Sequence, residues 1–277
     1  GQVVKIIIVV SPLHLFHTRL TVDFLCYRTH FRLMHTRILS TGGKFVSRSI
    51  QPIKMNGYHN IGDMRKSYRD NKDAFTEDQL VSQTDPFAQF ADWFEKIKGI
   101  PEILEPNAMC LATSNKDGQP SARFVLLKGF GKDVGGFTFF TNYNSRKGSD
   151  LEQNSKAALT FYWDKLNRQI RIEGTVTKVP EPENDVYFQR RPLASQIGAA
   201  ASAQSTIIAS RDVLIEKAEE ISKNCNGRVE KPKHWGGYLL VPYFFEFWQG
   251  QSDRLHDRIC FKRDNDTDPW KLFRLAP

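Results

Sequence analysis

The sequence is poor in cysteine: its 277 residues include four, and no two of these stand in a CxxC pair. Histidine is also scarce in the larger part of the chain, because five of the seven histidines precede residue 63. A structural zinc site needs four such ligands at short spacings, so no zinc site is predicted. Isolated cysteines of this kind fit a reducing compartment better than a secreted domain held together by disulfides.

Several catalytic motifs are absent as well. There is no GxSxG nucleophile elbow, no HExxH helix and no glycine fingerprint at the start of a βαβ unit. The segment "GFGKDVGG" (129–136) contains glycines and a lysine, but it lacks the spacing of a phosphate-binding P-loop and leads into an apolar strand. We interpret it as a hairpin turn. No nucleophile with a neighbouring base is visible, which argues against the common hydrolase classes.

Acidic residues are almost missing from the first 62 residues, where eight lysines and arginines stand against Asp23 alone. That segment therefore carries a formal charge of +7 out of +8 for the whole chain, which leaves +1 for the remainder. So small a charge gives the larger part of the chain little attraction for nucleic acid. The apolar run "IIIVV" (6–10) is too short to span a bilayer. We therefore expect no nucleic-acid partner and no membrane partner.

These differences divide the chain in two. Residues 1–62 are predicted to be a basic, disordered N-terminal extension, and residues 63–277 are predicted to be a folded domain. A segment rich in arginine and serine with few acids is typical of a mitochondrial transit peptide, and a leader without a targeting role is the alternative. The predicted location is the cytoplasm, or the mitochondrion if the extension is a transit peptide.

The folded domain is predicted to be mainly β. A helix is expected over 84–102, where Asp85 can cap the first turn and Gly99 can end the last one. Six or seven apolar strands joined by short turns indicate an antiparallel barrel with peripheral helices, and not a doubly wound parallel sheet. The other expected elements are a hairpin within 107–130, a strand at 137–142, a strand pair within 156–180, helices over 181–192 and 210–224, and strands over 234–250 and 253–263.

Two groups of basic residues indicate phosphate sites. In "TNYNSRKGSD" (141–150) a strand gives way to a helix, with Asn144 or Ser145 as its cap and Arg146 and Lys147 in its first turn. Cations at a helix N-terminus are unfavourable unless an anion binds with them, and the free N–H groups there would also bind a phosphate. The alternative is a solvated Arg-Lys pair.

The second group lies in "YFQRRPLASQIG" (187–198). On a helix that ends near the proline of this segment, Tyr187 and Arg191 are four residues apart and share a face, and Ser195 follows. Together with Lys128 these residues would form a second monophosphate pocket, whereas the alternative is an ordinary helix end. Two pockets of this size indicate two phosphorylated small molecules.

The segment "QGQSDRLHDRICF" (249–261) brings three cation-capable side chains close together. Read with the period of a β-strand, Arg254, His256 and Arg258 fall on one face. They would repel one another unless bound anions lay against them. The alternative is a surface ladder in which the neighbouring aspartates pair with the arginines.

Longer motifs connect these groups. They include "PSARFVLLKGF", "FFTNYNSRKG", "FYWDKLNRQIRIEG", "YFQRRPLASQIG", "EFWQGQSDRLHDR" and the terminal "RLAP". In this order, over residues 64–277, the chain resembles the pyridoxine (pyridoxamine) 5′-phosphate oxidase family. The resemblance implies a mainly β (α+β) fold, the FMN-binding split antiparallel β-barrel with peripheral helices, and a homodimer that binds FMN at the subunit interface.

The resemblance also implies a set of site residues. The FMN contacts would be Arg123, Phe124, Val125, Leu126, Phe140, Thr141, Arg146, Lys147, Gln169, Gln204, Ser205, Trp248 and Arg258. The substrate contacts would be Arg65, Lys66, Ser67 and Tyr68 in a mobile flap, with Lys128, Tyr187, Arg191, Ser195, Arg254, Leu255 and His256. Arg254 and His256 would be catalytic, and no metal is implied. The cations of 249–261 would then share a face because two stacked molecules bind against it.

The implied activity is FMN-dependent oxidation of pyridoxamine 5′-phosphate and pyridoxine 5′-phosphate to pyridoxal 5′-phosphate. A hydride would pass from the substrate C4′ to flavin N5, and O2 would be reduced to H2O2. Because the cofactor carries the redox chemistry, no protein nucleophile is needed. Two alternatives stay open: a split-barrel flavoprotein such as a reductase with another substrate, and a binding module for nucleic acid or for pyridoxal phosphate without turnover. The second group of basic residues, a separate substrate pocket, argues against a flavoprotein with another substrate. The near-neutral charge of residues 63–277 argues against a nucleic-acid binder.

Overall fold

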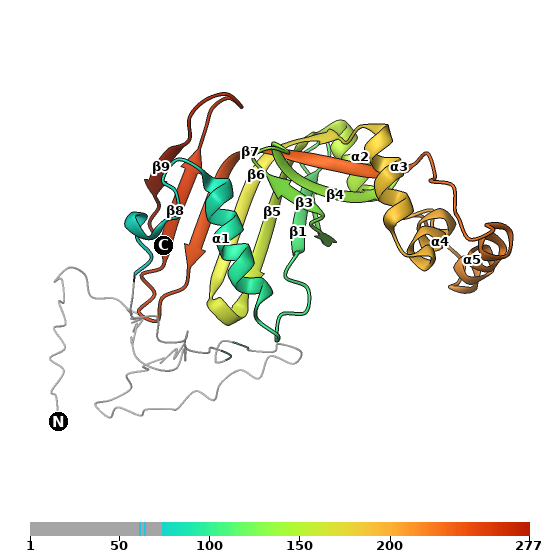
Figure 1. Cartoon of the computed structure of the whole chain (residues 1–277), viewed down its shortest axis with the longest axis horizontal. Coiled ribbons are helices and arrows are strands. Elements are labelled where there is room, and N and C mark those ends of the chain that lie inside the picture. Colours follow the sequence, from blue (N-terminus) through green and yellow to red (C-terminus); the bar gives the residue numbers. More distant parts are fainter. Residues whose placement is uncertain (1–60, 62–63, 65–73) are drawn as a thin grey trace, which may run out of the picture. The chain divides into compact units, whose positions relative to one another are not determined.

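The computed structural model describes residues 61, 64 and 74–277 (Figure 1). Apart from residue 61, the predicted basic extension lies outside the described residues, and so does the predicted flap at Arg65, Lys66, Ser67 and Tyr68. In the part of the chain that is described, no helix is both long and apolar enough to cross a membrane.

Within residues 74–277, nine strands form one antiparallel sheet with the order β2-β1-β5-β6-β7-β4-β3, and β8 and β9 extend it beside β7. The hairpins predicted from turn residues are all present, including the one around "GFGKDVGG". The strands are β1 (Ala108–Ser114), β2 (Pro120–Leu126), β3 (Gly129–Gly131), β4 (Gly136–Asn142), β5 (Lys156–Trp163), β6 (Arg168–Lys178), β7 (Trp235–Gln249), β8 (Asp257–Lys262) and β9 (Lys271–Arg274).

The sheet divides along β7, the longest strand. One edge of β7 pairs with β6, while its other edge pairs first with β4, over 235–240, and then with β8, over 244–249. Pro242 lies between these two halves, opposite the shift of register at Glu173 and Gly174. Proline has no N–H group and is tolerated at such an irregularity. The result is a curled half-barrel with peripheral helices, which confirms the predicted mainly β architecture.

The predicted strand over 253–263 is partly wrong, because β8 begins only at Asp257. The residues before it form a turn in which the Arg254 N–H donates to the Gln251 carbonyl and the Leu255 N–H donates to the Asp253 carboxylate. An aspartate that accepts from the backbone two residues ahead favours a turn over a strand. Arg254 and His256 therefore do not share a strand face with Arg258.

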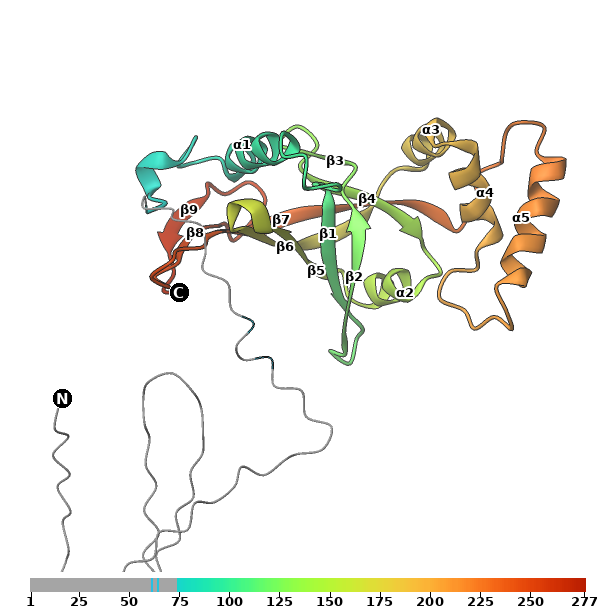
Figure 2. The ribbon, with the colours of Figure 1, turned by 90° about the horizontal axis from the view of Figure 1, so that it is seen from below.

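In the same described range, 74–277, five α-helices lie around the sheet. Figure 2 shows α1 on one side of the sheet, α2 on the other side near β1 and β2, and α3, α4 and α5 together where β4 ends and β7 begins. The helix α3 stops one residue before Arg191, because the following proline disfavours a helical conformation at that position. The bounds are α1 (Pro86–Lys98), α2 (Arg146–Gln153), α3 (Glu181–Arg190), α4 (Leu193–Ala201) and α5 (Asp212–Asn224), with single 3₁₀ turns at Glu77–Gln79 and Asp164–Leu166.

The core lies between α1 and the face of the sheet that it covers. As predicted, Asp85 caps α1, accepting hydrogen bonds from the N–H groups of Phe87 and Ala88. The ring of Phe90 is fully buried, with its centroid 4.7 Å from that of Phe130 and 5.0 Å from that of Phe137. Edge-to-face contacts of this kind add to the burial of apolar area.

The opposite face of the sheet carries polar and exposed side chains, which form two rows. Residues paired across neighbouring strands project from the same face, so the registers define these rows. The first row is Tyr162, Gln169, Trp248 and Arg258. The second row is Phe124, Cys110, Thr160, Arg171, Glu246 and Cys260. We call this face the outer face.

Truncating Phe90 tests the position of the core. We expect Phe90→Ala to lower the free energy of unfolding by about 3–5 kcal/mol, because it removes a fully buried ring and leaves a cavity. Urea unfolding followed by far-UV circular dichroism measures the change. Leu104→Ala is the control, since Leu104 is 90% exposed and should change stability by about 0.5 kcal/mol or less. Equal effects of the two substitutions would contradict this description of the core.

Candidate functional site

The first group of cations lies where β4 turns into α2. The Ser145 hydroxyl accepts a hydrogen bond from the Gly148 N–H and so caps the helix, as predicted. A Cβ atom at position 148 would lie 1.9 Å from the Tyr143 carbonyl oxygen, so only glycine allows the helix to begin this close to the preceding turn. This geometry places Arg146 and Lys147 in the first turn of α2, where its free N–H groups favour an anion.

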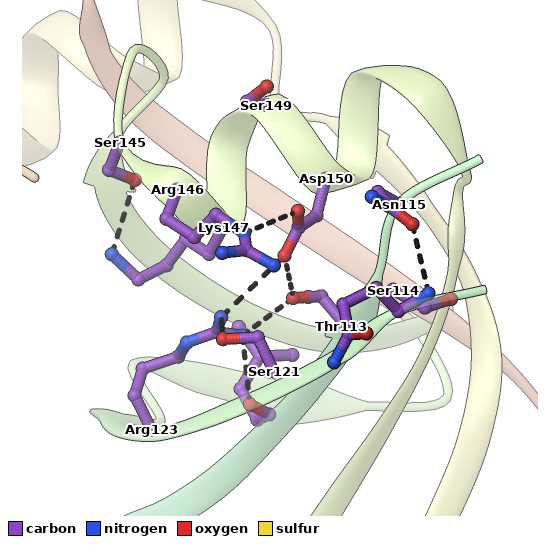
Figure 3. A network of polar contacts seen from close by, with 12 residues as sticks. Thr113, Ser114, Asn115, Ser121, Arg123, Ser145, Arg146, Lys147, Ser149 and Asp150 are labelled. Atoms are coloured by element: carbon purple, nitrogen blue, oxygen red, sulfur yellow. Dashed lines mark hydrogen bonds and ion pairs between the residues drawn. The ribbon is translucent and has the colours of Figure 1, made fainter. Parts of the chain in front are cut away.

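Arg123, from β2, joins this group through a buried carboxylate (Figure 3). The Asp150 carboxylate accepts a hydrogen bond from Arg146 Nε at 3.0 Å, and its other oxygen lies 3.7 Å from Arg123 Nη2. Thr113 connects the two, because its hydroxyl accepts from Arg123 Nη1 and donates to Asp150, both at 2.7 Å. The predicted residues Arg123 and Arg146 are thus held in one cluster.

Lys147 is buried and lies at the junction with the loop after α4. Its ammonium group donates to the Gln204 side-chain oxygen at 2.8 Å and to the Ser145 hydroxyl at 3.2 Å. The Thr141 hydroxyl donates to the same oxygen of Gln204 at 3.2 Å. Burial, together with the charge of Arg123, lowers the pKa of Lys147 to about 8. A bound anion would stabilise the charged form of Lys147, which burial disfavours.

The second group of cations is packed on aromatic rings. Tyr187 stacks on Phe140 with ring centroids 3.9 Å apart, and the Arg191 guanidinium lies 4.7 Å from the centroid of Trp235. Burial lowers the pKa of Arg191, and among the described residues its buried Nη1 atom finds no hydrogen-bond acceptor. A buried guanidinium nitrogen that lacks an acceptor is costly, so this position suits an anionic ligand.

The remaining residues predicted for that pocket are only partly joined to it. Ser195 lies in the first turn of α4, a helix that begins directly after Pro192. Lys128 lies between β2 and β3, and within the described residues its ammonium group has no ion-pair or hydrogen-bond partner. The structure thus brings Tyr187 and Arg191 together, while no hydrogen bond or ion pair in the described part of the chain joins Lys128 to them.

The predicted FMN residues of the sheet lie mainly on the outer face. Gln169, Trp248 and Arg258 are neighbours in its first row, and Phe124 projects from its edge strand with 77% of its side chain exposed. The side chain of Val125 instead packs against the core, because alternate residues of β2 point to opposite faces. Only the backbone of Val125 can therefore face a ligand.

Arg258 is engaged by the protein itself. Its Nε and Nη2 atoms donate to the buried Glu246 carboxylate at 2.8 and 3.1 Å, and its Nη1 atom donates to the Ala276 carbonyl. Arg171 donates to the same carboxylate at 2.7 Å. Burial alone would raise the pKa of Glu246, but hydrogen bonds from the two arginines outweigh it and hold the pKa below its ordinary value. The alternative of a surface ladder is not seen among the described residues, because neither Asp253 nor Asp257 pairs with Arg254 or Arg258. Asp253 accepts the Leu255 N–H, and Asp257 pairs with Arg274.

The turn before β8 carries the two residues predicted to be catalytic. Arg254 is exposed and has a φ of 72°, a left-handed conformation that costs energy for a residue with a side chain. The His256 ring lies 4.8 Å from that of Trp248, and its Nδ1 atom accepts from the Gln251 N–H at 3.0 Å. Ser205, beside Gln204, has the same left-handed φ of 72°. Such outliers are common at functional sites.

Reasoning from the sequence missed several residues of these groups. Asp150 could have been found, since it lies four residues after Arg146 on the same helix and this spacing favours an ion pair. Glu246 and Trp235 sit within a long apolar strand, and no local signal distinguishes them from core residues. Thr113 becomes visible only when the register of β1 and β2 is known.

These groups fit a flavin mononucleotide. Two arginines and a lysine at a helix N-terminus match the charge and the hydrogen-bonding capacity of a phosphate monoester. The outer face offers the amide of Gln169, the indole ring of Trp248 and the exposed ring of Phe124 for an aromatic ring system. The orphaned nitrogen of Arg191 supplies a second anion position.

Comparisons with known proteins identify the family of the chain. Residues 95–225 match the family model described as "Pyridoxamine 5'-phosphate oxidase", and residues 235–277 match that described as "Pyridoxine 5'-phosphate oxidase C-terminal dimerisation region". The chain is 52% identical over 231 residues to the pyridoxine-5′-phosphate oxidase of Bos taurus, covering 78% of this chain and 87% of the relative. It is 51% identical over 232 residues to the pyridoxine/pyridoxamine 5′-phosphate oxidase of Bombyx mori, covering 78% and 89%.

Among solved structures, PhzG from Burkholderia lata in complex with tetrahydrophenazine-1-carboxylic acid superposes with a TM-score of 0.68 at 30% identity, covering 74% of this chain and 98% of that one. An FMN-binding protein from Nostoc punctiforme superposes with a TM-score of 0.55 at 17% identity, covering 68% and 95%, and it supports the fold alone. On the sequence matches, the chain belongs to the pyridoxamine 5′-phosphate oxidase family.

Proposed function

We propose that this protein is an FMN-dependent oxidase that converts pyridoxine 5′-phosphate and pyridoxamine 5′-phosphate to pyridoxal 5′-phosphate. The observation that carries the proposal is the identity of about half the residues with relatives named for this activity, over 78% of the chain. The two separate anion positions, at Lys147 and at Arg191, agree with one phosphorylated cofactor and one phosphorylated substrate. A phenazine carboxylate, the ligand named for PhzG, has no phosphate to use the second position.

In the proposed enzyme, Arg123, Arg146 and Lys147 hold the FMN phosphate, and Thr141 and Gln204 close that end of the site. The outer face, with Gln169 and Trp248, holds the ring system, and Phe140 packs nearby against Tyr187. When bound, FMN supplies the two-electron redox chemistry, including the reduction of O2 to H2O2. The role of the chain is to bind, to orient and to exclude water.

Tyr187, Arg191 and Ser195 with Lys128 hold the substrate phosphate. Stacking of the Arg191 guanidinium on Trp235 fixes its plane, so that the nitrogen without an acceptor can receive a phosphate oxygen. When the phosphate is held at one end and the ring at the other, the substrate is bound in one orientation relative to the flavin. Orientation of this sort can contribute roughly 7–11 kcal/mol to lowering a barrier.

Arg254 and His256 orient the reacting end of the substrate. Because Nδ1 of His256 accepts the Gln251 N–H, the proton of the neutral imidazole resides on Nε2. In that state His256 acts through Nε2 as a hydrogen-bond donor and not as a base. Arg254 adds a positive charge at the reacting end of the site, where it would orient the substrate and stabilise the negative charge that the flavin gains on reduction.

The proposed assembly is a homodimer with FMN at the interface. It is supported by the match of β7, β8 and β9 to a dimerisation region and by exposed rings on the outer face, with Phe124 77% and Tyr162 59% exposed. Exposed aromatic side chains next to polar ones are typical of binding surfaces. A cytoplasmic location, or a mitochondrial one through the N-terminal extension, remains part of this proposal.

Assaying the purified protein tests the proposed reaction. We expect a yellow protein that consumes one O2 and releases one H2O2 for each pyridoxal 5′-phosphate formed from pyridoxine 5′-phosphate, with ammonia released in addition from pyridoxamine 5′-phosphate. Peroxide and aldehyde are measured in parallel. Unphosphorylated pyridoxine is the matched control and should react poorly, because the anion position at Arg191 is left unfilled. A protein that binds no flavin would refute the proposal.

Substitution of Arg254 separates turnover from cofactor binding. We expect Arg254→Ala to keep a normal ratio of flavin to protein and to lower kcat/KM about 100-fold or more, because the substrate loses an orienting charge. Arg211→Ala is the control, since Arg211 is an exposed arginine with no proposed role. The assigned role would be abandoned if Arg254→Ala retained wild-type turnover.

The pKa of Lys147 makes FMN affinity depend on pH. Below its lowered pKa of about 8 the side chain is an ammonium ion that attracts the phosphate, and above that pH it becomes neutral. We therefore expect the FMN dissociation constant to rise as the pH increases from about 7 to about 9, by at most about tenfold per pH unit for one proton. Lys147→Arg should flatten this rise, because a guanidinium stays charged. Quenching of flavin fluorescence measures both, and an affinity independent of pH would contradict the prediction.

A further inference from the structure

Asp150 is a carboxylate inside a site for a phosphate. It lies on α2 with 2% of its side chain exposed, among the residues that the proposed function assigns to the FMN phosphate (Figure 3). A negative charge there repels a bound phosphate. A buried carboxylate is also costly in itself, so its presence has to bring a compensating gain.

The contacts of Asp150 show what that gain is. One oxygen receives Arg146 Nε, and the other receives the Thr113 hydroxyl and faces Arg123 Nη2. Because the Thr113 hydroxyl donates its proton to Asp150, its lone pair is turned toward Arg123 Nη1. Asp150 thus helps to direct the guanidinium groups on two different elements, β2 and α2, and the Leu111 carbonyl and the Ser121 hydroxyl also accept hydrogen bonds from Arg123.

The charges also balance. Arg123, Arg146 and Lys147 carry three positive charges, and Asp150 reduces their sum to two. A phosphate monoester carries a charge of about −1.5 to −2 at neutral pH. With Asp150 present, the cluster matches the phosphate in charge, and the cations repel one another less when no phosphate is bound.

We propose that Asp150 is a positioning residue for the cofactor phosphate, which orients Arg123 through Thr113 and Arg146 directly. The inference rests on the proposed function, because it takes FMN as the ligand. It makes a prediction opposite to that of simple charge attraction. If only net charge mattered, Asp150→Asn would raise the charge of the cluster and tighten FMN binding, whereas loss of orientation weakens it.

The experiment compares FMN with riboflavin, which has the same ring system and no phosphate. The flavin is removed from full-length protein, and both dissociation constants are measured by fluorescence quenching at fixed ionic strength. We expect Asp150→Asn to weaken FMN binding about 10- to 100-fold, the range that corresponds to losing one or two charge-assisted hydrogen bonds. Riboflavin binding should stay within about twofold of wild type, since it does not use these contacts.

Glu152→Gln is the matched control, because it makes the same change of charge on the same helix at an exposed residue that forms an ion pair with Lys178, outside the Asp150 cluster. It should leave both dissociation constants unchanged. Tighter or unchanged FMN binding in Asp150→Asn would overturn the proposal, and so would an equal loss of FMN and riboflavin binding, which would indicate a general structural defect.

Thr113→Val keeps the test decisive if Asp150→Asn does not fold, and a double variant extends the test if it does. Thr113→Val removes the link to Arg123 but leaves the carboxylate in place, and it should weaken FMN selectively by a smaller factor. In the double variant Asp150→Asn with Arg146→Met, the effects should be far from additive, because Asp150 acts partly through Arg146. Additive effects, or an unaffected Thr113→Val, would overturn the proposal. Failure of the wild-type protein to bind FMN would refute the proposed function itself, and this outcome is distinct from the others.

Discussion

The pairing of β7 with three other strands is the constraint on which the rest of the structure depends. One edge of this strand binds β6, and its other edge binds β4 and then β8. Since β4 runs directly into α2, the first half of β7 sets the position of the cations at Arg146 and Lys147. Since the turn with Arg254 and His256 leads into β8, the second half sets the position of that turn. One continuous strand thus fixes the separation of two groups that lie about a hundred residues apart in sequence.

Buried acidic side chains form ion pairs with the arginines of the candidate site and hold them in place. Asp150 holds arginines of β2 and α2, and Glu246 holds Arg171 and Arg258 on the outer face. Asp257 accepts hydrogen bonds from Gln251 and from the Phe75 N–H and pairs with Arg274. It therefore ties the turn before β8 to the first described segment and to β9. A buried charge is tolerated only when it is paired, so each acid fixes the geometry of its partners.

Much of this could be predicted from the sequence, because the strands and turns have strong local signals. The helix α1, the hairpins and the cap of α2 at Ser145 follow from periodicity, turn residues and capping chemistry. The turn at 250–256 could not, because alternation of side chains does not reveal that Asp253 will bond to the backbone. The packing of Val125 into the core and the pairing of Arg258 with Glu246 depend on strand registers, which are set by contacts distant in sequence.

Cys260 shares a row of the outer face with Glu246, beside the position that the proposed function gives to the flavin. Burial, with a smaller contribution from the carboxylate, raises the pKa of this thiol to about 12. The thiolate is the nucleophile that attacks a peroxide oxygen, and at neutral pH almost none of the Cys260 thiol is in that form. Cys260 is therefore held in its protonated, unreactive form, which would protect this thiol from the H2O2 that the proposed reaction releases at each turnover.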